Sequence, residues 1–130
     1  MNHDQDLNFI PVIRFSSVVV FDESLRVLLV CERKAGIEGL WGTPGGGDEP
    51  GEIPVQAAKR ELYEETGLKN IELSLLETLL WHGDRGDILM CHIFSPKFTR
   101  AFTLRQSSPM KFQRWAGLTD RRSKQCTKTE

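Results

Sequence analysis

The sequence predicts an α/β domain, on the strength of three observations. Short runs rich in Val, Ile, Leu and Phe alternate with polar turns, as β-strands do. Between them lies one segment with helical periodicity that opens on a proline and closes on a glycine. At 130 residues, 39% apolar and 27% charged, the chain has the size and composition of one globular domain with a single hydrophobic core.

The first two expected strands lie near the start of the chain. Residues 10–21 are rich in Val, Ile and Phe, and residues 25–31 form another aliphatic run. Residues 22–24 between them are polar, so the two runs are expected to form a β-hairpin of buried strands. Residues 34–47 then hold six glycines and a proline, which predicts a long loop of the kind that is often functional.

A helix is expected to begin at Pro54 and to end at Gly67. Proline suits the first helical turn because its missing N–H needs no partner there, and glycine suits the left-handed position that ends a helix. Ile53, just before the proline, is a poor N-cap residue. In the helical projection, Val55, Ala58 and Leu62 form an apolar side. Gln56, Lys59 and Tyr63 form the opposite, polar side.

Three glutamates, Glu61, Glu64 and Glu65, occupy an arc of this helix beside the apolar stripe. Like charges at these spacings destabilise a helix unless a positive charge compensates them. A hard divalent cation with oxygen ligands is the natural compensator for several carboxylates. The pattern therefore predicts a metal site between the end of the helix and the glycine-rich loop.

Further strands are expected at residues 71–81 and 88–94, joined by the polar turn 82–87, with a last short strand at residues 112–115. No internal repeat or linker divides the chain.

The composition argues against several classes of protein. A net charge of −1 gives no general attraction to nucleic acid or to an acidic membrane, and no apolar run is long enough to span a bilayer. Three scattered cysteines without a CxxC pair argue against a disulfide framework and a zinc site, and fit a reducing compartment. The first residues lack the pattern of a signal peptide. We expect a soluble, cytoplasmic protein with no membrane or nucleic-acid partner, residues 1–118 forming its single domain and residues 119–130 a polar, frayed tail.

One stretch resembles the signature of a known family. Residues 46–68 follow the pattern glycine, five residues, glutamate, seven residues, Arg-Glu, an aliphatic residue, any residue, Glu-Glu, any residue, glycine and an aliphatic residue. This is similar to the Nudix box with every position filled, and the preceding Arg33, Trp41, Pro44 and Gly45 resemble its lead-in. The box positions are Gly46, Glu52, Arg60, Glu61, Leu62, Glu64, Glu65, Gly67 and Leu68.

The resemblance implies a Nudix-type α/β/α sandwich with a mixed β-sheet. The implied activity is hydrolysis of a pyrophosphate bond in a nucleoside diphosphate linked to another moiety, with Mg²⁺ or Mn²⁺ as cofactor. A nucleoside triphosphate, cleaved to the monophosphate, is the default substrate, since no feature outside the box matches the subgroups that act on ADP-ribose, coenzyme A or dinucleoside polyphosphates.

The resemblance also implies roles for individual residues. Glu61, Glu64 and Glu65 would hold the metal, together with a backbone carbonyl of Gly45 or Gly46. Glu61 would also act as base toward the attacking water, so that the implied catalytic residues are Glu61, Arg60 and Glu64. The planar guanidinium of Arg60 would hold a carboxylate in place. Glu52 would support the group of glutamates, either as a metal ligand itself or as a residue that contacts the ligands.

Contacts to the substrate are expected from Arg33, Trp41, His82 and Arg105, each with an alternative. Trp41 could equally be a core residue, Arg33 a solvated surface charge, and His82 a structural residue. Arg105 belongs to a basic stretch, residues 97–114, that would grip an anionic substrate or simply face solvent.

Many Nudix enzymes take a further acidic ligand from beyond the box, but this chain has no acid between Asp87 and Asp120. Either the box suffices, or Asp84 or Asp87 reaches in from the preceding turn; Gln106 could fill the space without a charge.

Two alternatives to a nucleotide hydrolase stay open. One is a catalytically idle nucleotide sensor on the same fold, which the intact set of box glutamates disfavours. The other is a pyrophosphohydrolase that acts on RNA 5′ ends, which the low net charge disfavours. A homodimer is compatible with the sequence, because the polar C-terminal tail leaves one sheet face without an obvious cover.

Overall fold

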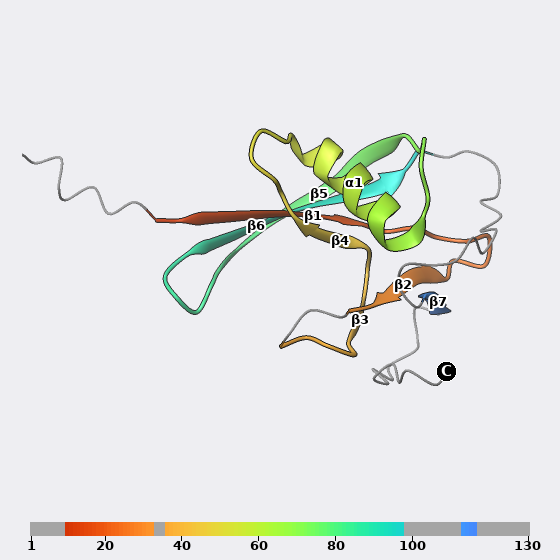
Figure 1. The fold of residues 1–130 in the computed structure, drawn as a ribbon, viewed down its shortest axis with the longest axis horizontal. Coiled ribbons are helices and arrows are strands. Elements are labelled where there is room, and N and C mark those ends of the chain that lie inside the picture. Colours follow the sequence, from red (N-terminus) through yellow and green to blue (C-terminus); the bar gives the residue numbers. More distant parts are fainter. Residues whose placement is uncertain (1–9, 33–35, 98–112, 117–130) are drawn as a thin grey trace, which may run out of the picture.

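The computed structural model describes residues 10–32, 36–97 and 113–116, the last of these as backbone only. Its centre is a four-stranded sheet in the order β4-β1-β6-β5 (Figure 1). The strands are β1 (Val12–Val18), β4 (Gly45–Gly47), β5 (Leu73–His82) and β6 (Ile88–Pro96). β1 runs parallel to β6, while the β1–β4 and β5–β6 pairs are antiparallel. The predicted α/β class and mixed sheet are therefore confirmed.

A second, smaller sheet has the order β3-β2-β7. It consists of β2 (Val27–Cys31), β3 (Trp41–Gly42) and β7 (Gln113–Ala116), paired antiparallel throughout. The predicted hairpin of the first two strands is wrong in its pairing, although both strands exist. Both edges of β1 are taken by β4 and β6, so the hairpin exists only near its turn, beyond the end of β1. There Phe21 bridges Val27, and the N–H of Leu28 donates to Val20 O at 2.9 Å.

The glycine-rich segment is also more regular than predicted. It contributes β3 to the small sheet and β4 to the large one. Glycine is required at Gly45 because β4 and β1 approach very closely: a Cβ there would lie 2.9 Å from the Cα of Ser17. No ordinary side chain fits such a contact, so Gly45 serves close strand packing rather than loop flexibility.

Helix α1 (Pro54–Thr66) begins and ends where predicted. Ile53 offers no side-chain cap, and its own N–H instead donates to Gln56 Oε1 at 3.2 Å. This is one half of the reciprocal arrangement known as a capping box. At the other end, Gly67 adopts φ 77° and its N–H donates to Tyr63 O at 2.8 Å, which closes the helix in the left-handed conformation that favours glycine.

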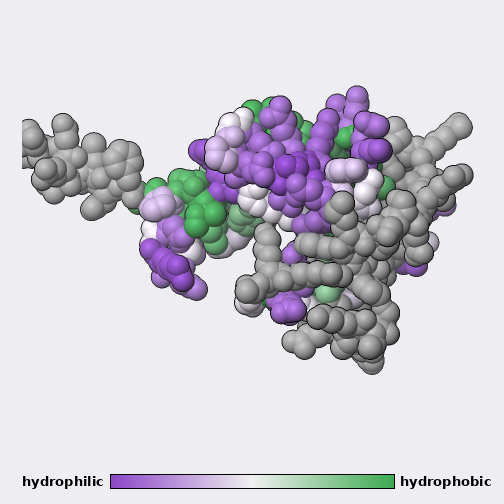
Figure 2. Space-filling model, in the orientation of Figure 1, coloured by the Kyte–Doolittle hydropathy of each residue, from purple (hydrophilic) through white to green (hydrophobic). Residues whose placement is uncertain are grey.

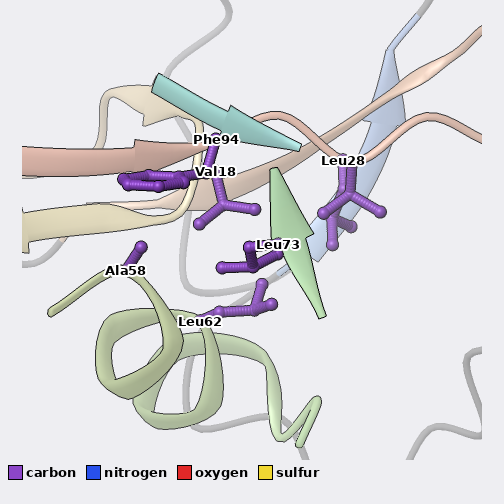
Figure 3. Packing of buried hydrophobic residues seen from close by; sticks show 7 residues of the cluster. Val18, Leu28, Ala58, Leu62, Leu73 and Phe94 are labelled. Atoms are coloured by element: carbon purple, nitrogen blue, oxygen red, sulfur yellow. The ribbon is translucent and has the colours of Figure 1, made fainter. Parts of the chain in front are cut away.

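Helix α1 covers one face of the four-stranded sheet, and the core lies between them (Figure 3). Ala58 and Leu62 point from the helix toward the sheet, as predicted, and both are buried. The cluster consists of Val18, Val20, Leu28, Ala58, Leu62, Leu73 and Phe94. This core fixes the helix over β1 and β4, which is where the glutamates need to be held.

Beyond the helix, β1, β5 and β6 extend as an arm, to the left in Figure 1. Hydrophobic atoms gather on the exposed surface of this arm, whereas hydrophilic atoms cover the region of α1 (Figure 2). β5 forms the outer edge of the sheet in the described residues. The exposed apolar side chains on the arm are Val12, Ile13, Leu75, Leu76, Leu79, Leu80 and Trp81.

Two observations bear on the chain's surroundings. Among the described residues, no helix is long and apolar enough to cross a membrane. Cys91 is free and buried. The reducing compartment stays a prediction.

Leu62→Ala should lower the free energy of unfolding by about 2–5 kcal/mol, because it removes a side chain that is 1% exposed and leaves a cavity under α1. Lys59→Ala is the control on the same helix: Lys59 is exposed on α1, and its loss should change stability by no more than about 0.5 kcal/mol. Urea denaturation of both variants tests the assignment, and equal effects would place the core elsewhere.

Candidate active site

Arg60 lies at the centre of a group of carboxylates. Its Nε donates to Glu52 Oε2 at 2.9 Å and its Nη2 to Glu52 Oε1 at 3.0 Å, which is a two-pronged ion pair. Its Nη1 donates to Glu61 Oε1 at 2.9 Å and lies 3.3 Å from Glu64 Oε2. Its Nη2 also donates to the backbone oxygen of Gly47 at 3.0 Å. One guanidinium therefore joins the loop before α1, the helix itself and strand β4.

The charges of this group stabilise one another. The hydrogen bonds from Arg60, and then the N–H of Glu49, hold the pKa of Glu52 below its usual range. The ion pair with Glu52 in turn raises the pKa of Arg60 above its usual range. The Arg60 side chain is 21% exposed and that of Glu52 17%, so the pair is partly shielded from solvent. Both groups stay ionised at any pH near neutrality.

The loop that carries Glu52 is a tight turn with a clear sequence basis. Glu49, Pro50, Gly51 and Glu52 form it, and the N–H of Glu52 donates to Glu49 O at 3.0 Å. Proline presets the second position, and Gly51 at φ 83° supplies the left-handed third position. The Glu52 carboxylate folds back and accepts the N–H of Glu49 at 2.8 Å. The turn thus aims the carboxylate of Glu52 at Arg60.

Gly46 leaves the space into which Glu61 fits. A Cβ at Gly46 would lie 2.6 Å from Glu61 Cδ, so any larger residue would collide with that carboxylate. The side chain of Glu61 is only 12% exposed. Gly46 of the glycine-rich segment therefore lies directly against a glutamate of α1.

The other two helix glutamates differ from each other in exposure. Glu65 is 4% exposed, which is rare for a carboxylate, whereas the Glu64 side chain is 51% exposed and lies 3.3 Å from Arg60 Nη1. Because Glu64 and Glu65 follow Glu61 by three and four residues, both project from the helix surface next to Glu61.

These residues fit a hard divalent cation in their chemistry. The donors are carboxylate oxygens and a glycine carbonyl, and the space beside Gly46 has no room for a side chain at that position. Within the described residues, however, no three acidic, histidine or cysteine side chains already converge as a metal site. Glu52, Glu61 and Glu64 lie instead around the guanidinium of Arg60.

The structure does not bring every predicted site residue to this place. Trp41 is half-buried in β3 of the small sheet, opposite Cys31. His82 is exposed at the end of β5, where Ile88 of β6 pairs with both His82 and Val12 of β1. Gly46 pairs instead with Ser16, four residues further along β1 than Val12. At about 3.3 Å per residue this separation is on the order of 13 Å.

The expected extra acid is not supplied by the turn after β5. Gly83 N–H donates to Asp87 O at 2.9 Å, and the Asp87 carboxylate packs against Gly83. Asp87 is therefore held within the turn at the end of the arm, away from the glutamates. Arg33, Arg105 and Gln106 lie outside the described residues. In the basic stretch only Lys97 has a described side chain, which lies 3.8 Å from Glu72.

Sequence reasoning missed three contributors to the site. The carbonyl of Gly47 binds Arg60, and Glu49 supplies both the N–H that binds Glu52 and a carboxylate 3.8 Å from Arg60. The Glu-Pro-Gly-Glu turn could have revealed Glu49 from sequence alone. Ser16 contacts the segment that carries Glu52, and only its polarity within an apolar run marks it in the sequence.

Comparison with known proteins gives consistent results. A family model described as the NUDIX domain matches residues 13–121. The mouse protein named nucleoside diphosphate-linked moiety X motif 6 is 37% identical over 89 residues, covering 64% of this chain and 28% of its own length. An RNA pyrophosphohydrolase of Bartonella clarridgeiae is 38% identical over 74 residues, covering 56% of this chain and 42% of its own length. This chain therefore spans less than half the length of either relative.

Solved structures share the fold at lower sequence identity. A MutT protein from Methanosarcina mazei Go1 superposes with a TM-score of 0.64 at 21% identity, over 83% of this chain and 78% of its own. The E. coli ORF135 protein gives a TM-score of 0.61 at 21% identity, over 82% and 74% of the two chains.

Gly46→Ala should lower the free energy of unfolding by about 1–3 kcal/mol, since the added methyl group displaces Glu61 from Arg60. Gly42→Ala is the control, because a Cβ at Gly42 meets nothing within 4 Å. Urea denaturation measures both. A Gly46→Ala protein as stable as the Gly42→Ala protein would show that Glu61 can move aside freely.

Proposed function

This chain belongs to the Nudix family, and on that premise we propose that it hydrolyses a pyrophosphate bond in a nucleoside diphosphate linked to another moiety. Nudix hydrolases generally need a divalent metal ion, and we take Mg²⁺ or Mn²⁺ as the ion used here. The single observation that carries the proposal is that Arg60 binds both Glu52 and Glu61, while Glu61 lies directly against Gly46.

The proposed chemistry explains why several carboxylates stand together. A pyrophosphate carries several negative charges that repel a water nucleophile, and a bound divalent ion neutralises them and lowers the pKa of water. Glu61, Glu64 and Glu65 would hold that ion, with the carbonyl of Gly45 or Gly46 completing the oxygen donors. Glu61, partly buried beside Gly46, would also accept the proton of the attacking water.

Arg60 has two tasks in this proposal. Its two-pronged bond to Glu52 fixes the guanidinium, and the fixed guanidinium then orients Glu61 and Glu64. Lysine could not do both, because an ammonium group lacks the planar fork. Glu52 acts through Arg60 and needs no contact with the metal.

The substrate we propose is a nucleoside triphosphate, cleaved to the monophosphate. No residue outside the box indicates a subgroup that acts on ADP-ribose, coenzyme A or dinucleoside polyphosphates. No proline lies about half the length of a strand after Leu68, and the sole tyrosine, Tyr63, is exposed on α1. Trp41, His82, Arg33 and Arg105 stay predictions as substrate contacts.

A second candidate is hydrolysis of the 5′-triphosphate end of RNA, which is favoured by the similarity to several proteins named RNA pyrophosphohydrolase. Both candidates share the same reacting group and the same glutamates. They differ in the surface beyond the triphosphate, where RNA binding calls for clustered basic and aromatic side chains. The net charge of −1 favours the free nucleotide.

Three wider predictions accompany the proposal. Residues 1–118 form one domain followed by a polar tail at 119–130, the protein works in the cytoplasm, and two copies associate through the arm. The outer edge of β5 supports the last of these, since a ten-residue edge strand with exposed Leu80 and Trp81 is a ready template for another strand.

Glu65→Gln should lower kcat by about 100-fold or more while the protein stays folded, since it removes a ligand charge and keeps the shape. Glu77→Gln, at an exposed position of β5, is the control and should leave kcat unchanged. The assay is phosphate-product release from NTPs, dNTPs, 8-oxo-dGTP, ADP-ribose, NADH, diadenosine polyphosphates, nucleotide sugars and triphosphorylated RNA, each with Mg²⁺, Mn²⁺ or EDTA.

Metal-dependent turnover of one class identifies the substrate, and faster release from RNA than from free GTP would favour the second candidate. No turnover of any substrate by a folded protein would contradict the proposed activity and favour a binding role. Full activity of Glu65→Gln would show that the metal ligands are wrongly assigned.

Size-exclusion chromatography with light scattering should give about twice the chain mass of 14.8 kDa at micromolar concentrations. Leu80→Lys should convert the dimer to a monomer, because Lys at a β5 position that is 60% exposed in the single chain disfavours pairing of edge strands. A wild-type mass of one chain would contradict the proposed association.

A further inference from the structure

Ser16 of β1 is a buried polar residue to which the chemistry above gives no role. It is fully buried, and its Oγ lies 3.3 Å from Asp48 Oδ1 and 3.1 Å from the backbone oxygen of Pro54. The single hydroxyl hydrogen is thus shared between two acceptors that lie 32 and 38 residues further along the chain.

The two acceptors are the two ends of one short segment. Asp48 follows directly on β4, and Pro54 is the first residue of α1. The N–H of Asp48 also donates to Arg14 O at 3.1 Å, which attaches the same end of the segment to β1. The Ser16 hydroxyl therefore sets how far the end of β4 stands from the start of the helix.

The segment between these ends carries Glu52. Any change in the separation of the ends moves the turn at residues 49–52, and with it the carboxylate that holds Arg60. Arg60 in turn holds Glu61 against Gly46, which is the residue paired with Ser16 across β4 and β1. A continuous series of contacts thus connects Ser16 with the turn, the turn with Arg60, and Arg60 with Glu61, the proposed base. Glu61 lies against Gly46, which is next to Ser16 in the sheet.

We infer that Ser16 is a positioning residue of the active site: its hydroxyl, through Asp48 and Pro54, keeps Glu52, Arg60 and Glu61 in register with Gly46. The inference rests on the proposed function only for its kinetic consequences. A purely structural hydroxyl would change stability alone, whereas a positioning hydroxyl changes kcat and metal affinity as well, because small displacements of reacting groups are costly.

Ser16→Ala tests the inference against Ser17→Ala. Ser17 is the next residue of β1, lies on the opposite face of the sheet, and shares a hydrogen bond of 2.6 Å with Thr43. We expect Ser16→Ala to lower kcat by about 10- to 100-fold with KM changed by no more than about threefold. Ser17→Ala should keep the wild-type kcat at temperatures well below its unfolding transition.

Asp48→Ala provides a second variant at a half-buried position, which keeps the test decisive if Ser16→Ala does not fold. We expect Asp48→Ala to lower kcat in the same way, and the double variant to be no slower than the slower single variant, because both remove the same contact. Additive losses in kcat would mean that the two residues act separately and would contradict the inference.

A titration with Mn²⁺ alone separates this inference from the proposed function. We expect Ser16→Ala or Asp48→Ala to weaken Mn²⁺ binding by about tenfold, with Ser17→Ala unchanged. If the wild type binds Mn²⁺ but hydrolyses nothing, the proposed function fails while the titration still tests the positioning role. Wild-type kcat and Mn²⁺ affinity in a folded Ser16→Ala or Asp48→Ala protein would overturn the inference.

Discussion

The two-pronged ion pair between Arg60 and Glu52 is the interaction on which the site depends. It ties the turn before α1 to the middle of the helix, and from there the same guanidinium reaches Glu61, Glu64 and the carbonyl of Gly47. The contacts do not contribute equally. An exposed pair at i, i+4 such as Arg60–Glu64 is worth only about 0.3–0.5 kcal/mol, whereas a two-pronged pair shielded from solvent has both better geometry and less screening.

The arginine also changes how the clustered glutamates are understood. The repulsion among Glu61, Glu64 and Glu65 suggests by itself that a metal ion compensates their charge. In the structure Arg60 already neutralises part of it, at Glu61 and Glu64. Like charges can therefore stand together in the folded chain before any cation binds. The metal proposed for catalysis then serves mainly the anionic substrate.

Close packing of the backbone is the second constraint. Gly45 lets β4 lie against β1, and Gly46 leaves the place that the Glu61 carboxylate takes. Leu62, buried in the core, holds the helix at the height from which Glu61 reaches that place. Its burial is worth about 1.5–3 kcal/mol, so a core residue and a glycine together position the carboxylate proposed as the base, although neither of them forms a hydrogen bond with it.

The sequence by itself determined the elements and the chemistry. Pro54, Gly67 and the apolar stripe of α1 predicted the helix correctly because capping and periodicity are local properties. The box pattern predicted which glutamates are neighbours, because fixed spacing on a helix fixes which side chains lie close together, and their roles stay predictions. The positions of β1, β2, β5 and β6 were likewise readable from runs of aliphatic residues, whereas β3 and β4 lie in a segment predicted to be a loop.

Only the tertiary structure decided how the elements pair and which distant groups meet. The first two strands were expected to form a hairpin, yet β1 pairs with β4 and β6 and leaves β2 to another sheet. His82 and Asp87 follow the box in sequence but lie at the end of the arm, while Ser16, 38 residues before Pro54, closes the base of the turn. Strand order and register depend on the sum of many contacts between remote segments, and no local pattern in the chain encodes that sum.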